Sequence, residues 1–199
     1  AGGTINPIDN IKALSQLARK YNLYIHLDGA RIWNAYVETG IKPAEYASHF
    51  DSVSCCLSKG LGTPIGSIIA GTKEFIKEAF AVRKAWGGGM RQVGVIASAG
   101  LYALQNNIER LKEDHQKAKL LAGNLAEIKN LNIDLDLVET NIVMFTPVGI
   151  SIEEFQLKCK QNGLLLGTGK VGEIRAVTHM DVSVDDIKVA TGIINSVLA

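Results

Sequence analysis

Two short apolar runs, each followed by a polar residue, constrain the fold of this chain more than any other feature. Residues 23–27 and 51–57 are predicted strands, and the stretch between them contains two helical segments, 32–39 and 43–47. Strands that are apolar throughout, rather than alternating, are typical of a parallel sheet covered by helices. We therefore predict an α/β fold in which these two strands run in the same direction, preceded by a helix over 8–21.

The pattern changes in the second half of the chain. A third predicted strand over 67–70 and a helix over 73–84 are followed by a long helical region, 91–131, which we expect to break near Asn106 and Asn107. Beyond it we expect an α+β unit. Its elements are strands over 133–138, 142–145 and 173–178 and helices over 152–161 and 184–198, the last with Ser183 as N-cap. We predict two domains, 1–106 and 107–199.

Composition excludes several classes of function. The chain has 199 residues, 47% of them hydrophobic, and a net charge of +1, which gives no basic surface for nucleic acid or for a membrane. Its longest apolar stretch, 93–104, is too short to span a bilayer. The three cysteines have the spacing of neither a disulfide framework nor a zinc site. We expect a cytoplasmic protein with no metal, no nucleic-acid partner and no membrane partner.

Asp28 and Lys59 follow the two predicted strands. Because the carboxyl ends of parallel strands meet at one edge of a sheet, we expect both side chains there. A lysine amine can form an imine with pyridoxal 5'-phosphate (PLP), and a carboxylate can keep the pyridine nitrogen protonated. Ser58 could hydrogen-bond the phosphate. Considered alone, Asp28 could simply be a turn residue, and Lys59 could simply be a solvated side chain.

Two arginines favour the binding of a carboxylate. Arg31 lies one helical turn beyond Asp28, and its planar fork suits a carboxylate. Arg175 lies in a strand-like segment among apolar neighbours and therefore needs a partner. Its alternatives are a surface position on an edge strand, or an ion pair with Glu173 or Asp181.

Two glycine-rich segments have different interpretations. Glycines 87–89 open a helix near Arg91, where backbone amides and a guanidinium could bind an anion, although a simple interhelical turn is the alternative. Residues 167–172 match G-x-G-x-x-G literally. Because a strand-like segment rather than a helix follows, we predict a hairpin loop and not a dinucleotide site.

The histidines are weaker signals. His26 shares a strand face with Asp28, and we interpret it as a satisfied core histidine or a partner of Asp28. His179 could line the substrate side, whereas His49 and His115 are predicted at the surface.

Four motifs together resemble a threonine aldolase, a family with the aspartate-aminotransferase-like fold of PLP enzymes (fold type I). They are His26–Arg31, Ser58–Gly62, Gly87–Gln92 and Arg175–His179. The resemblance implies that residues 1–106 are the C-terminal part of the large, parallel-sheet PLP domain and that 107–199 form the small α+β domain. It also implies a homo-oligomer, either a dimer or a tetramer.

The resemblance implies a reaction and a set of site residues. The reaction is the retro-aldol cleavage of L-threonine or L-allo-threonine to glycine and acetaldehyde. Lys59 would form the imine with PLP and Asp28 would bind its ring nitrogen. The remaining roles are substrate carboxylate binding by Arg31 and Arg175, and cofactor contacts by Ser58, Arg91 and Lys84.

The family also carries an N-terminal half that this sequence lacks, including early strands and the phosphate-binding loop. We expect a fragment that, alone, binds PLP poorly and turns over little threonine, and that needs the missing half as its partner. Two alternatives stay open. One is another lyase of the same fold, such as a β-eliminating enzyme that acts on aromatic amino acids. The other is a non-catalytic remnant that serves as an interaction module.

Overall fold

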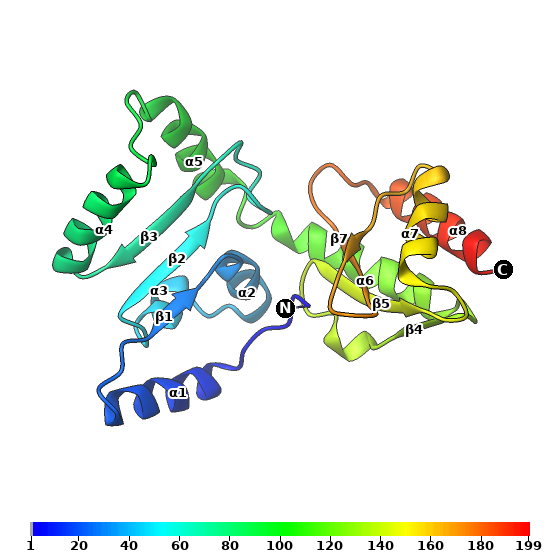
Figure 1. Cartoon of the computed structure of the whole chain (residues 1–199), viewed down its shortest axis with the longest axis horizontal. Helices are drawn as coiled ribbons and strands as arrows, with labels where there is room; N and C mark the ends of the chain where they lie inside the picture. The colour runs from blue at the N-terminus through cyan, green and yellow to red at the C-terminus, as the bar shows by residue number, and fades with distance from the viewer. Residues whose placement is uncertain (1) are drawn as a thin grey trace. The chain divides into compact units, whose positions relative to one another are not determined.

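The computed structural model describes residues 2–199, which form two compact units (Figure 1). One unit contains residues 6–110. The other combines Leu111–Ala199 with the residues up to Ile5.

The first unit, residues 6–110, is built on a three-stranded sheet with the order β1-β2-β3. The strands are β1 His26–Asp28, β2 Ser52–Cys56 and β3 Ser67–Gly71. The helices are α1 Ile8–Lys20, α2 Ile32–Thr39, α3 Pro43–Ala47, α4 Lys73–Ala85 and α5 Gly94–Asn106.

Strands β1 and β2 are parallel, and α2 and α3 lie in the connection between them, which confirms the predicted crossover. Strand β3 pairs with β2 in the antiparallel direction, so the sheet is mixed and the parallel arrangement predicted for the first two strands does not extend to the third. The reason is the short connection over 57–66. It contains no helix, and a parallel connection needs a crossover of a dozen or more residues.

Helices cover one face of this sheet. Ile11 of α1, Ile32 of α2 and Tyr46 of α3 form a buried cluster, against which Leu27 and Cys55 pack from the strands. Because side chains alternate along a strand, the neighbours of Leu27 on β1 project to the opposite face. That face is the one on which His26 and Asp28 lie.

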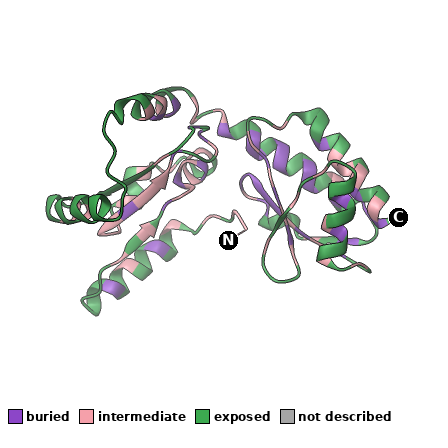
Figure 2. Ribbon diagram, turned by 45° about the horizontal axis from the view of Figure 1, so that its top comes forward, coloured by how far each residue is buried: buried purple, intermediate pink, exposed green. Residues whose placement is uncertain are grey.

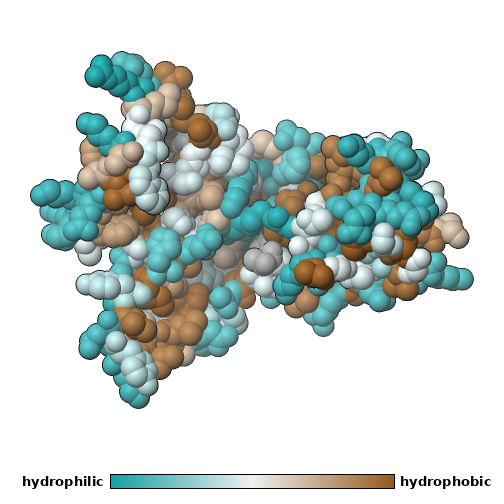
Figure 3. All heavy atoms as spheres, in the orientation of Figure 1, coloured by the Kyte–Doolittle hydropathy of each residue, from teal (hydrophilic) through white to brown (hydrophobic). Residues whose placement is uncertain are grey.

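Much of the first unit is exposed (Figure 2). The predicted strand over 23–27 begins only at His26, and Leu23 and Tyr24 are 60% and 93% exposed, so this part of the prediction is wrong. Helix α4 has no buried residue, and Trp86 at its C-terminal end is 87% exposed. Figure 3 shows apolar residues at the surface of this unit.

The second unit contains an antiparallel sheet with the order β4-β5-β7-β6. Its strands are β4 Leu131–Ile133, β5 Ile142–Pro147, β6 Gly167–Thr168 and β7 Ile174–Val177. Its helices are α6 Leu111–Ala126, the 3-10 helix η1 Leu135–Leu137, α7 Ile152–Gln161 and α8 Val184–Leu198.

Side-chain caps define several ends of these elements. The prediction of a strand over 133–138 is wrong. Asp134 accepts a hydrogen bond from the Asp136 N–H, and the 3-10 helix η1 begins there. Ser183 caps α8 as predicted, and it forms a capping box with Asp186. Residues 167–172 lead from β6 into its antiparallel partner β7, which confirms the predicted hairpin.

The core of the second unit lies between its sheet and its helices. Phe145 and Ile174 of the sheet pack with Leu121, Phe155 and Ile194 of the helices, all nearly fully buried. Phe145 and Phe155 meet edge to face with ring centroids 6.1 Å apart. Ile174 is adjacent to Arg175 in β7, so the arginine side chain projects to the opposite face of the sheet.

Candidate functional site

Asp28 ends β1, and its exposed carboxylate is held by the turn that follows. Its Oδ1 accepts a hydrogen bond of 3.1 Å from the Ala30 N–H. Gly29 makes the turn possible, because a Cβ there would lie 2.8 Å from the carbonyl oxygen of Ser54. The close approach of the two strands at Gly29 therefore fixes where the Asp28 carboxylate lies.

Arg31 is three residues further on, at the N-cap position of α2. The Ile32 N–H donates to the Gly29 carbonyl at 2.9 Å, so a tight turn joins β1 to α2. Arg31 is half-buried and lies on the turn that Asp28 begins. The structure thus brings Arg31 to the same end of β1 as Asp28.

Ser58 and Lys59 lie in the loop after β2. Leu57 and Leu61 are 8% and 2% exposed and anchor the loop in the unit, while Ser58 and Lys59 between them are exposed. The Gly62 N–H donates to the Lys59 carbonyl at 2.9 Å and closes a turn, for which Gly62 has a positive φ of 75°. Within residues 2–199 the Lys59 amine makes no hydrogen bond or ion pair.

The same loop is fastened to the end of α5 and the segment after it. The Asn107 amide donates to the Leu61 carbonyl at 2.8 Å, and the Arg110 guanidinium donates to the Gly60 carbonyl at 3.3 Å. These bonds hold the loop immediately after Lys59. The lysine side chain therefore projects from a fixed loop.

Asp28 and Lys59 lie beyond the carboxyl ends of adjacent parallel strands. Asp28 is opposite Ser54 in the register, and β2 ends at Cys56, three positions before Lys59. This is the edge at which open α/β sheets bind ligands. The catalytic roles of the two residues stay predictions.

His26 extends the polar face of the sheet on which Asp28 lies. Its Nδ1 is 2.8 Å from the Ser52 Oγ and its Nε2 is 3.3 Å from the Ser54 Oγ. The histidine is exposed, so the interpretation as a core residue is wrong. Its ring is held by two serine hydroxyls of the neighbouring strand.

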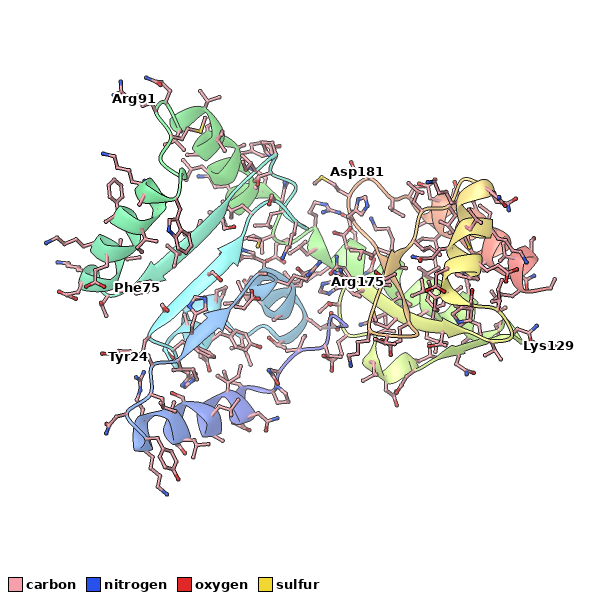
Figure 4. All side chains as sticks on the ribbon, viewed as in Figure 1. Tyr24, Phe75, Arg91, Lys129, Arg175 and Asp181 are labelled. Carbon is pink, nitrogen blue, oxygen red and sulfur yellow. The ribbon has the colours of Figure 1, made fainter. Side chains whose placement is uncertain are left out.

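Lys84 and Arg91 lie on either side of the glycines that connect α4 to α5. Lys84 is in the last turn of α4, and Arg91 follows the glycines that connect α4 to α5 (Figure 4). Both are exposed, and within residues 2–199 neither forms a hydrogen bond or ion pair with Asp28 or Lys59. The structure therefore does not join them to those two residues.

Arg175 belongs to the second unit and lies opposite Met144 of β5 in the register (Figure 4). Its Nε is buried and has no hydrogen-bond partner among the described residues. The expected alternative partner Asp181 instead contacts His179, at 3.3 Å. Most buried side-chain polar atoms in proteins have a hydrogen-bond partner, so the unpartnered Arg175 Nε is an exception in this unit.

A polar cluster on α6 was not predicted from the sequence. Asp114 and Lys117 form an ion pair of 2.9 Å with side chains 0% and 10% exposed. His115 is 2% exposed, so its predicted surface position is wrong. The apolar residues Ala118, Leu121 and Leu125 recur on the same helix, and this helical period was the signal that could have revealed the buried stripe.

The cysteines and the other titratable groups form no further candidate metal site in the described part of the chain. No group of three metal-ligating side chains occurs among residues 2–199. Burial raises the pKa of the Cys159 thiol to about 11 and also raises the pKa of Cys55. No helix in the described range combines the length and the apolar character needed to cross a membrane.

The fold is that of PLP enzymes of fold type I, matched over roughly half of their length. A protein of Exiguobacterium sp. 255-15, provisionally assigned as an aromatic amino acid beta-eliminating lyase/threonine aldolase, superposes with a TM-score of 0.81. The match has 21% identity and covers 98% of this chain and 58% of that one. LysN, the alpha-aminoadipate aminotransferase of Thermus thermophilus, gives a TM-score of 0.75 at 14% identity, over 96% of this chain and 54% of its own.

The chain belongs to the beta-eliminating lyase family, whose model matches residues 1–147. It is 38% identical over 190 residues to low-specificity L-threonine aldolase 1 of Arabidopsis thaliana, covering 94% of this chain and 53% of that one. It is 41% identical over 185 residues to the low specificity L-threonine aldolase of Escherichia coli K12, covering 91% and 53%. The chain thus spans about half the length of these relatives.

Proposed function

We propose that this chain carries the cofactor lysine and the substrate-binding arginines of a PLP-dependent threonine aldolase. The reaction would cleave L-threonine or L-allo-threonine to glycine and acetaldehyde. The observation that carries the proposal is the placement of Asp28 and Lys59 beyond adjacent parallel strands, with the Lys59 amine unpaired among the described residues. The names of the relatives supply the substrate class.

The donor set at this edge fits PLP. Asp28 uses one carboxylate oxygen for the Ala30 N–H, which leaves the other oxygen for the ring nitrogen of the cofactor. Lys59 would hold the cofactor through its amine nitrogen, and the neighbouring Ser58 hydroxyl would donate to the phosphate. When bound, PLP supplies a protonated ring that draws electrons from the bond being broken.

The residues of this chain then select which bond breaks. Asp28 holds the proton at the ring nitrogen, because a carboxylate beside it stabilises the charged form. Arg31 and Arg175 would bind the substrate carboxylate, each with a fork of N–H donors. Holding the carboxylate fixes the orientation of the Cα–Cβ bond, and such orientation contributes strongly to rate and to reaction choice.

Lys84 and Arg91 are assigned to the cofactor site by the resemblance to the family. Both are exposed cations near the glycine loop, and Gly89 lies against Lys84, with a Cβ position 3.5 Å from its Cγ. We propose that Arg91 binds a cofactor phosphate in a neighbouring subunit of a homo-oligomer. Lys84 would line the same site.

The exposure of the site predicts weak binding by the 199-residue chain alone. His26 and Asp28 both lie on the solvent-exposed face of the three-stranded sheet. A cofactor there would stay in contact with water, which weakens its electrostatic contacts with Asp28. We therefore propose that full activity requires further protein that covers this face.

A second candidate function has support from the family description. The matching family is that of beta-eliminating lyases, and the similar Exiguobacterium structure is described both as an aromatic amino acid beta-eliminating lyase and as a threonine aldolase. Assays of the intact protein on threonine, allo-threonine, tyrosine and tryptophan distinguish the aldolase from the eliminating lyase. Release of glycine and acetaldehyde supports the aldolase, whereas release of pyruvate from an aromatic amino acid would replace it with the eliminating lyase.

A further inference from the structure

Helix α5 packs on the first unit through one narrow face. Its buried residues are Gly100 and Ala103, and the half-buried Asn107 at its C-terminal end follows at the same helical spacing. Val95 and Tyr102, on other faces of the helix, are exposed. The packing of α5 therefore depends on the face that carries Gly100, Ala103 and Asn107.

This face contacts the start of the loop that carries Lys59. A Cβ on Gly100 would lie 3.1 Å from the Leu57 Cδ1, so the leucine side chain packs directly on the helix backbone. Leu57 is buried and is the first residue after β2. Its carbonyl accepts the Thr63 N–H at 3.3 Å, and its own N–H donates to the Gly66 carbonyl at 3.0 Å. Helix α5 thus supports the loop where it leaves the sheet.

The end of α5 and the segment after it hold the middle of the same loop. The Asn107 amide donates to the Leu61 carbonyl at 2.8 Å, and the Arg110 guanidinium donates to the Gly60 carbonyl at 3.3 Å. The Lys59 carbonyl accepts the N–H three residues further on, at 2.9 Å. Three consecutive carbonyls of the loop are therefore bonded, and two of the three donors belong to the end of α5 and the segment after it.

These bonds restrict the backbone at Lys59 and leave its side chain available. A peptide plane whose carbonyl is bonded resists rotation, so the Cα of Lys59 is held on both the sheet side and the loop side. Within residues 2–199 the Lys59 amine has no hydrogen-bond or ion-pair partner. The loop therefore determines from which point this amine reaches a ligand.

We infer that Gly100, Asn107 and Arg110 are positioning residues for Lys59, which fix its loop so that the amine is presented to the aldehyde carbon of PLP. This inference rests on the proposed function of Lys59. When the amine joins PLP, its nitrogen replaces the aldehyde oxygen, which leaves as water with the two amine protons. Holding the reacting nitrogen near that carbon raises the rate of this step. The three residues touch neither cofactor nor substrate and act through the backbone of residues 57–61.

The first test needs no cofactor and measures amide hydrogen exchange in the full 199-residue chain. We expect the Gly62 and Thr63 N–H groups to exchange about fivefold faster in Asn107→Ala, because the loop that they close has lost one of its bonds. Asn106→Ala is the matched control, since the Asn106 amide donates to the Tyr102 carbonyl within α5. We expect its exchange to stay within about twofold of wild type. A folded Asn107→Ala protein with wild-type exchange at both N–H groups overturns the inference.

Gly100→Leu is the second variant, in case Asn107→Ala does not fold. The added side chain must displace Leu57, so we expect faster exchange at the same two N–H groups. Gly94→Leu is the control on the same helix, because a Cβ there meets nothing within 4 Å. Wild-type exchange in a folded Gly100→Leu protein, or equally fast exchange in Gly94→Leu, contradicts the inference.

The second test measures the joining of Lys59 to PLP in the intact protein freed of cofactor. The absorbance of added PLP reports the rate of this step, and pyridoxamine 5'-phosphate, which has no aldehyde, reports binding alone. We expect joining to be about tenfold slower in Asn107→Ala, while the dissociation constant for pyridoxamine 5'-phosphate stays within about twofold of wild type. Equal losses in the two measurements would mean that the whole site is disturbed, and the positioning role is then wrong.

Lys59→Ala separates the inference from the proposed function. If Lys59→Ala abolishes the absorbance change and Asn107→Ala keeps the wild-type rate, the positioning role alone is wrong. If Lys59→Ala joins PLP as the wild type does, the proposed role of Lys59 fails and the inference fails with it.

Discussion

Asp28 lies directly opposite Ser54 in the parallel pair of β1 and β2, and Gly29 brings the two strands so close that a Cβ on it would lie 2.8 Å from the Ser54 carbonyl oxygen. From Ser54 the chain runs through the end of β2 to Lys59 at the same edge of the sheet. The pairing of β1 with β2 thus brings both residues to this edge, and the loop after β2, which Asn107 and Arg110 hold, carries the lysine.

Gly29→Ala should destabilise the protein because the nearest atom to the added methyl group, at 2.8 Å, is the backbone carbonyl oxygen of Ser54, which cannot rotate away. We expect a loss of about 1–3 kcal/mol in the free energy of unfolding, measured with urea. Gly94→Ala is the matched control, since a Cβ there meets nothing within 4 Å at the start of α5. Equal stability of the two variants would show that the strands do not approach this closely.

Ser183→Ala should destabilise the second unit by about 1 kcal/mol, because the Ser183 hydroxyl accepts the Asp186 N–H at the start of α8. Thermal unfolding measures the change. Ser196→Ala removes a hydroxyl within the same helix that donates only to the Gly192 carbonyl, and we expect it to be nearly neutral. A cost at Ser196 as large as that at Ser183 contradicts the capping role.

Asp51 should make stability depend on pH. A hydrogen bond from the Ile25 N–H and the pairing with Arg19 lower the pKa of its carboxyl below the ordinary value. Because the folded-state pKa is lowered, the stabilisation is complete above the unfolded pKa of about 3.9 and is lost as pH falls through the folded value. We expect Asp51→Asn to be less stable than wild type at neutral pH and the difference to shrink in acid. A difference that persists unchanged in strong acid rules this out.

Cys159 should resist modification in the folded protein. Its thiol is fully buried in the core of the second unit, and burial raises its pKa to about 11, so little thiolate forms near neutral pH. We expect alkylation at mildly alkaline pH to label the half-buried Cys56 before Cys159, and urea to remove the difference. Mass spectrometry of the labelled peptides decides, and early labelling of Cys159 is the contrary result.

Elements with local signals were predictable from the sequence. Pro43 at the start of α3 and the capping serines Ser151 and Ser183 define helix starts that the sequence places correctly. The placement of Asp28 and Lys59 beyond adjacent strands also follows from local pattern, because each apolar run ends at a polar residue. These features depend on a few neighbouring residues.

Elements that depend on distant packing were not predictable. Leu23 and Tyr24 have strand propensity, yet residues 23–25 form no strand because no described strand pairs with them. The direction of β3 depends on the length of its connection. Lys117 and Asp114 give no sign of burial in the sequence, since charges are rarely buried, and only the carbonyls of the turn after β7 explain their position.

The most direct test of the central claim is to find the lysine that binds PLP. The intact protein is incubated with PLP, reduced with borohydride and digested, and the peptides are analysed by mass spectrometry. We expect the phosphopyridoxyl group on Lys59, its loss in Lys59→Ala, and normal labelling in Lys84→Ala. A group fixed on another lysine, or equal labelling of Lys59→Ala at its remaining lysines, would contradict the assignment of Lys59 as the cofactor lysine.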